Sequence, residues 1–186
     1  MRLRLFLAAG LMTVALLAMV GGRAHTLASG DVVTLEIFPP DPASLFRGDD
    51  VPLRYSISLL DLDRLRSDGD FEVGDPVYVV LKSGTPYWTA DWVSKTMPIF
   101  RTHHTVIKGR VAYHWRNRTG PPDAKGQLDV TYGIESYAVP KSQAVELKDP
   151  LSVGLMSVAV AVDASGNSAI KQILVNGKPR FTEPAF

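Results

Sequence analysis

Three carboxylates are the side chains of this chain whose spacing comes closest to a chemical site. Asp49 and Asp50 directly precede an apolar run, and Glu135 lies in a stretch otherwise suited to burial. If they converged in a groove, they could serve an envelope hydrolase or bind a sugar. The alternative is structural: Gly48 gives a turn its backbone freedom, Asp49 caps free N–H groups, and Glu135 pairs with an Arg or with backbone donors. We favour the structural interpretation and keep the binding one as the alternative.

A second acidic group is typical of a cation-binding loop. Its carboxylates are Asp61, Asp63, Asp68, Asp70, Glu72 and Asp75. An EF-hand loop beginning at Asp61 needs Asp or Asn at its fifth position and Gly at its sixth. Leu65 and Arg66 stand there, so we expect a solvated loop.

Histidines offer the other candidate metal ligands. His103 and His104 are adjacent, and neighbours on a strand point to opposite faces, so they do not readily chelate one ion together. His114, expected on the next strand, could meet one of them. We favour exposed or partly buried histidines and expect no metal and no cofactor.

Nucleophilic catalysis has no recognisable group of residues here. No Gly-x-Ser-x-Gly elbow is present, and Lys82-Ser83 and Lys141-Ser142 both lie in turn contexts. The chain has 0 Cys, which excludes thiol catalysis, a disulfide framework and lipid attachment through cysteine. We therefore name no catalytic residue and favour a protein that is not an enzyme.

The charge of the chain excludes nucleic acid as a partner class. The formal net charge is +1, but residues 1–30 hold three Arg and no acid, which leaves 17 basic and 19 acidic residues in the remainder. A near-neutral domain lacks the basic surface that nucleic-acid binding requires.

The N-terminus predicts a membrane segment. Residues 5–22 form an apolar run that contains only Thr13 as a polar member. As a helix it spans roughly 27 Å, close to the thickness of a bilayer's hydrocarbon core. Arg2 and Arg4 precede it, which predicts a cytoplasmic N-terminus and a single-pass inner-membrane protein with its domain outside. The alternative is a signal peptide cut after Ala24 or Ala28, with secretion to the periplasm.

The remainder predicts a mainly β fold. Short apolar or alternating runs indicate about eight strands, at residues 32–38, 51–59, 76–81, 87–93, 107–115, 128–132, 157–162 and 169–175. Residues 163–167 have hairpin-turn chemistry, residues 60–66 favour one or two helical turns, and residues 142–147 favour a short helix. We predict an antiparallel sandwich or open barrel over residues 31–186, after an anchor or signal segment at 1–30.

Aromatic residues form a possible cluster around the middle strands. Val111, Tyr113 and Trp115 alternate in a way that predicts a shared face. Core packing is the usual role for such side chains, whereas an exposed patch would mark a protein or membrane contact.

Three blocks of the chain resemble one protein family. Residues 46–55 resemble the signature after which the GDYXXLXY family is named: Gly48, Asp49, Leu53 and Tyr55 match it, and Asp50 stands where the family has Tyr. Residues 132–140 resemble a second block of the family, with Tyr132, Gly133, Glu135 and Tyr137 as the signature residues we single out. The final hairpin through Gly177 resembles the third.

The resemblance implies a location and a kind of partner. It implies a bacterial, membrane-anchored protein without an assigned activity, encoded near multi-spanning membrane proteins. The function we expect is therefore a tethered, non-enzymatic domain that docks on an integral membrane protein. The expected docking surface is an apolar or aromatic patch near residues 48–55 or Glu135.

Overall fold

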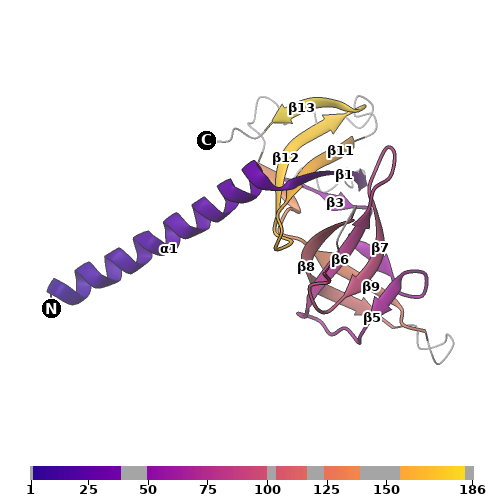
Figure 1. The fold of residues 1–186 in the computed structure, drawn as a ribbon, viewed down its shortest axis with the longest axis horizontal. Helices are drawn as coiled ribbons and strands as arrows, with labels where there is room; N and C mark the ends of the chain where they lie inside the picture. Colours follow the sequence, from indigo (N-terminus) through magenta and orange to yellow (C-terminus); the bar gives the residue numbers. More distant parts are fainter. Residues whose placement is uncertain (1, 39–49, 100–103, 117–123, 139–155, 183–186) are drawn as a thin grey trace.

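One long helix and thirteen strands make up the described part of the computed structural model, which covers residues 2–38, 50–99, 104–116, 124–138 and 156–182. The helix extends away from a β unit built of two sheets and a short ribbon (Figure 1). The mainly β fold and the N-terminal apolar helix that the sequence predicts are thus both confirmed.

Helix α1 (Arg2–Ser29) is almost wholly apolar and stands outside the core. Its large apolar side chains between Phe6 and Val20 are 55% to 75% exposed. The segment Ala9–Ser29 is long and apolar enough to cross a membrane. A signal sequence near the N-terminus has the same properties, so the helix has the length and composition of either an anchor or a signal.

The first sheet follows directly from α1 and is antiparallel. Its five strands, in spatial order, are β13 (Lys178–Thr182), β12 (Ser168–Val175), β11 (Met156–Val162), β1 (Asp31–Phe38) and β3 (Arg54–Tyr55). The hairpin predicted around residues 163–167 is confirmed as β11–β12. Gly166 has a φ of +83° in this turn, a conformation that favours glycine.

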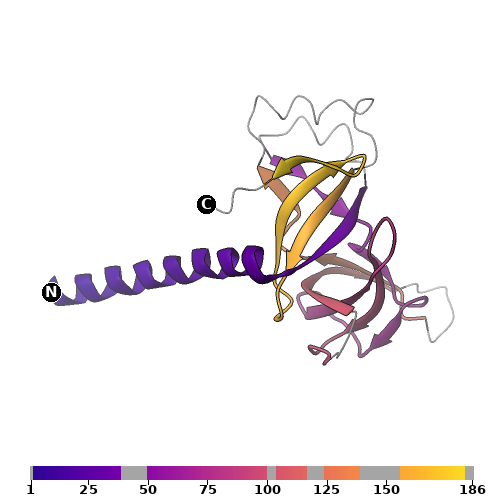
Figure 2. The same cartoon turned by 45° about the horizontal axis from the view of Figure 1, so that its top comes forward.

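The second sheet curls into a half-barrel (Figure 2). Its six strands, in spatial order, are β4 (Leu59–Asp61), β9 (Gln127–Thr131), β8 (His104–Trp115), β6 (Pro76–Lys82), β7 (Thr89–Ser94) and β5 (Arg66–Asp68). All neighbours are antiparallel except β5 and β7. A separate ribbon pairs β2 (Asp50–Pro52) with β10 (Ser136–Ala138).

Both sheets contribute to one hydrophobic core. On β1 the period-two pattern buries Val33, Leu35 and Ile37, as expected for a strand with one face inward. They belong to the same cluster as Val79 of β6 and Ile107 of β8. Because the cluster crosses from one sheet to the other, burial holds the sheets together in a chain without disulfides. Backbone hydrogen bonds from Trp88 to Thr34 and from Lys108 to Gly166 add to this contact.

The secondary structure predicted for residues 51–66 differs from the observed one. The single strand expected at 51–59 is divided into β2, β3 and the start of β4, with a turn at residues 56–58. The helical turns expected at 60–66 amount to one hydrogen-bonded turn, in which the Leu65 N–H donates to the Asp61 carbonyl. Ser58 explains the turn at 56–58 between β3 and β4, because its side chain and backbone bond back to Tyr55 and reverse the chain.

Two further predictions need comment. The short helix expected at 142–147 lies outside the described residues. The strands number more than about eight because β2, β3, β4, β5 and β10 are pieces of two or three residues.

Candidate functional site

The first two of the three blocks that carry the family resemblance meet inside the core through a reciprocal pair of tyrosines. The Tyr55 hydroxyl, fully buried, donates to the carbonyl of Ile134 in the second block. The Tyr132 hydroxyl donates in the opposite sense, to the carbonyl of Ile57, at 2.6 Å. Each ring therefore packs in the core, and its hydroxyl donates a hydrogen bond to a backbone carbonyl of the other segment. We call this pair the tyrosine lock.

Backbone bonds extend the contact between the two blocks. The Leu53 N–H donates to the carbonyl of Glu135 at 2.7 Å, and the ladder continues where β2 pairs with β10. The Leu53 side chain is 3% exposed. Leu53, Tyr55 and Tyr132 thus point into the core and form no part of the surface.

Glu135 has the structural role that the sequence favours for it. Its carboxylate accepts the backbone N–H of Tyr132 and, at 2.9 Å, that of Gly133. Gly133 has a φ of +79°, which a residue with a Cβ adopts only at a cost. By accepting these two N–H groups, the carboxylate supplies hydrogen-bond partners for backbone donors in a tight turn.

Burial and the nearby carboxylate keep both tyrosines protonated. Burial raises the pKa of the Tyr55 hydroxyl far above its ordinary value, and the charge of Glu135 adds to that effect. The pKa of Tyr132 rises for the same two reasons, burial first, with a contribution from Asp129. The hydroxyls therefore act as hydrogen-bond donors.

The remaining signature residues are less completely described. Gly48 and Asp49 lie outside the described residues, and Asp50 and Tyr137 are described by their backbone pairing in the β2–β10 ribbon. Binding through Asp49, Asp50 or Glu135 stays a prediction. The Glu135 carboxylate, for its part, is already bound by two backbone donors.

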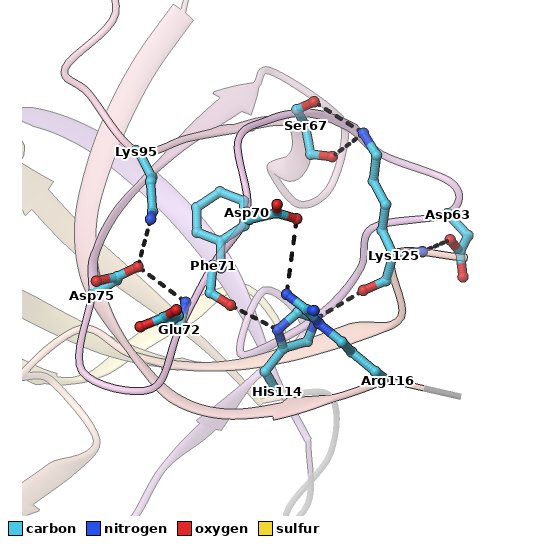
Figure 3. A network of polar contacts seen from close by, with 10 residues as sticks. All are labelled: Asp63, Ser67, Asp70, Phe71, Glu72, Asp75, Lys95, His114, Arg116 and Lys125. Carbon is cyan, nitrogen blue, oxygen red and sulfur yellow. Dashed lines mark hydrogen bonds and ion pairs between the residues drawn. The ribbon is translucent and has the colours of Figure 1, made fainter. Parts of the chain in front are cut away.

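The acidic segment at residues 61–75 is held by partners within the protein (Figure 3). Asp75 pairs with Lys95 at 2.8 Å, and Asp70 lies 3.8 Å from Arg116. The hydrogen bond from Lys95 lowers the pKa of Asp75. No three His, Asp or Glu side chains come together as a metal site within the described ranges.

The histidine prediction needs a correction. His104 and His114 both lie on β8, so His114 is not on the next strand. Ten residues of strand separate them by roughly 33 Å, which prevents them from sharing an ion. The His114 ring instead lies between two carbonyl oxygens, with Nδ1 2.9 Å from Phe71 and Nε2 2.7 Å from Lys125 (Figure 3).

An exposed apolar surface lies on the outer side of the half-barrel, and we call it the aromatic face. It consists of Leu59, Tyr113 and Trp115, whose exposed fractions are 42%, 52% and 45%. Leu59, Asp129 and Tyr113 are partners in register across β4, β9 and β8, so their side chains share one side of the sheet. The rings of Tyr113 and Trp115 lie 4.6 Å apart.

A β-bulge places the aromatic face outward, contrary to the shared face predicted for Val111, Tyr113 and Trp115. The pairing of β8 with β9 shifts between Val111 and Tyr113. The extra residue, Ala112, reverses the alternation, so Val111 is 1% exposed while the two aromatic residues reach solvent. The Arg54–Asp129 ion pair, at 3.0 Å, lies within this face, because Asp129 of β9 stands between Leu59 of β4 and Tyr113 of β8. A second pair, Asp61–Arg64 at 3.3 Å, lies beside it.

A contact at the end of α1 was missed from the sequence. Thr26 is 4% exposed, and its hydroxyl donates to Asp163 of the β11–β12 turn at 2.7 Å. The turn motif itself was recognisable. A lone threonine inside an apolar helix, however, carries no signal that it contacts a turn far along the chain.

The described residues define a mainly β protein with an apolar N-terminal helix and a tyrosine lock that joins two sequence blocks. The chain belongs to the GDYXXLXY protein family, whose model matches residues 12–173. This confirms the resemblance found in the sequence. None of the curated proteins and none of the solved structures matches the chain.

Proposed function

We propose that this protein is a membrane-tethered, non-enzymatic domain that docks on an integral membrane protein through the aromatic face. The tether is α1, with Arg2 and Arg4 in the cytoplasm and the β unit outside a bacterial cytoplasmic membrane. Its apolar side chains from Phe6 to Val20 are exposed in the isolated chain and need a lipid environment.

The aromatic face is the observation that carries the docking proposal. Tyr and Trp are enriched at protein interfaces and supply much of their binding energy. Here a Tyr, a Trp and a Leu share one side of the sheet, with the Arg54–Asp129 ion pair among them.

The position of the family signature also favours docking over catalysis. Leu53, Tyr55 and Tyr132 are buried, and the Glu135 carboxylate is bound to backbone N–H groups. These four residues maintain the fold, which favours a partner surface elsewhere. We place it on β4, β9 and β8 rather than near residues 48–55.

Cross-linked affinity purification of the full chain from native membranes tests the proposal. The comparison is between wild type and the double variant Tyr113→Ser, Trp115→Ser. Val73→Ser is the matched control, because Val73 is 65% exposed but lies outside the aromatic face. Asp49→Ala tests the alternative surface at the signature. Circular dichroism checks that every variant is folded.

We expect one multi-spanning membrane protein to be recovered with wild type and with Val73→Ser, and lost with the double variant. Equal recovery with the double variant would remove the aromatic face as the docking surface. Recovery of wild type alone, without a partner, would overturn docking and direct the work to sugar-ligand and hydrolase screens.

A further inference from the structure

The last turn of α1 is packed into the β unit. Thr26 is 4% exposed, on a helix whose large apolar side chains from Phe6 to Val20 are exposed. Its hydroxyl lies 2.7 Å from Asp163 Oδ2 and 3.1 Å from the carbonyl of Gly22. A hydroxyl has one proton, and the shorter distance and the negative charge direct it to the carboxylate.

Asp163 connects this helix turn to the β11–β12 hairpin. Besides the Thr26 hydroxyl, its two oxygens accept the N–H of Ser165 at 2.9 Å, the N–H of Asn167 at 3.0 Å and the Asn167 side-chain amide at 3.1 Å. An ionised carboxylate offers about four acceptor positions, so these donors use all of them. One side chain thus shapes the hairpin turn and binds the helix.

The linker between α1 and β1 is a single residue. Only Gly30 separates Ser29, the last helical residue, from Asp31, the first strand residue. The Gly30 N–H donates to the carbonyl of Thr26 at 3.0 Å. A Cβ at Gly30 would lie 2.6 Å from that oxygen and 2.8 Å from the nitrogen of Val162. The helix end and β11 are therefore as close as backbones can pack.

We propose that residues 24–30 are a rigid coupler, which keeps α1 attached to the mature protein and holds the β unit at a fixed orientation to the membrane. Cleavage after Ala28 would remove Thr26. Cleavage after Ala24 would leave Thr26 next to a free N-terminus, without the preceding helix. The inference rests on the proposed tether and adds that the aromatic face is presented to its partner at one angle.

Mass spectrometry and spin-label distances test the coupler in the full chain. The intact mass of protein purified from membranes reports whether cleavage has occurred. Because the chain has 0 Cys, Val20→Cys and Lys82→Cys create the only two labelling sites, one on exposed α1 and one on exposed β6. Their distance distribution is measured by double electron–electron resonance in lipid nanodiscs.

Three variants are compared with the wild type in the distance measurement. Thr26→Val removes the hydroxyl at nearly constant volume, Thr26→Ser keeps it, and a Gly-Ser-Gly-Ser insertion after Ser29 provides a flexible reference. We expect an uncleaved mass, with a narrow distribution in wild type and Thr26→Ser. We expect Thr26→Val to broaden toward the insertion variant.

Any of three results overturns the coupler. The first is a mature chain that begins after residue 24 or 28. The second is a wild-type distance distribution as broad as that of the insertion variant, and the third is a distribution that Thr26→Val leaves unchanged. A failed search for a docking partner leaves these readouts unaffected, so the two proposals fail separately.

Discussion

At Tyr55 and Tyr132 the phenol rings occupy the core, where every polar group needs a partner. The two hydroxyls find theirs on backbone carbonyls at Ile134 and Ile57, reached from opposite directions. Tyrosine suits this position because one side chain supplies both apolar area and a donor. Phenylalanine would supply only the area and leave a buried carbonyl without its partner.

The tyrosine lock yields a stability prediction. Tyr55→Phe and Tyr132→Phe should each lower the free energy of unfolding by about 1–3 kcal/mol, the cost of an unsatisfied buried acceptor. The double variant should deviate from additivity, because both bonds join the same two segments. Denaturant unfolding of the full chain in detergent measures this. Tyr113→Phe, at an exposed ring, is the control and should change little.

Asp163 yields a pH prediction. Burial opposes its ionisation, but hydrogen bonds from Thr26, Asn167 and Ser165 outweigh that and lower its pKa. Because the folded pKa lies below the unfolded value of about 3.9, this carboxylate stabilises the fold above that value. The contribution disappears as the pH falls through the folded pKa.

The melting temperature measured against pH tests this assignment. Asp163→Asn should melt below wild type at neutral pH, and the gap should narrow as the solution is acidified through about pH 4 and below. A gap that stays constant over that range would show that the charge of Asp163 is not the stabilising feature.

Among the elements, β8 combines two functions because of its bulge. Up to Val111 the strand follows one alternation, and after Ala112 it follows the opposite one. The change turns Tyr113 and Trp115 to solvent and places His114 on the other side of the strand. An irregular pairing in the middle of a strand thus produces both the aromatic face and the histidine contacts.

His114 yields a prediction at this scale, because it joins three segments. Its ring contacts the carbonyls of Phe71 and Lys125 from β8. His114→Ala should destabilise the protein by about 0.5–1.5 kcal/mol, because the imidazole N–H no longer donates to one of these carbonyls and the ring no longer links the segments. Hydrogen exchange should also become faster around residues 66–75. Tyr113→Ala, one residue away and pointing outward, should leave that exchange unchanged.

At the scale of the whole molecule, the described residues form a β unit and a long apolar helix that contact each other at Thr26 and Asp163. For a retained anchor, we expect alkaline carbonate extraction to leave the full chain in the membrane fraction. Replacing Leu11 and Leu16 by Arg should release it or block insertion, because each Arg near a helix centre costs about 2.5–3.5 kcal/mol. Val73→Arg adds a charge to the β unit and should stay in the membrane fraction.

Local patterns were sufficient for much of the fold. The long apolar run predicted α1, short apolar or alternating runs predicted β1, β6, β8 and β9, and turn residues predicted the β11–β12 hairpin, all close to their observed bounds. These elements are recognisable because side-chain period and turn chemistry act over a few residues. The prediction for residues 51–66 was wrong, because the alternation of apolar residues continues through Ser58 although the chain turns there.

The sequence by itself determined that the chain has an apolar N-terminal helix, a mainly β fold, a place in its family and no cysteine chemistry. Only the tertiary structure decided which side chains meet. Tyr55 and Ile134 are 79 residues apart, and Thr26 and Asp163 are 137 apart. Strand order brings such residues together, and no local pattern encodes strand order. The bulge at Ala112 was hidden for the same reason, because it exists only in the pairing of β8 with β9.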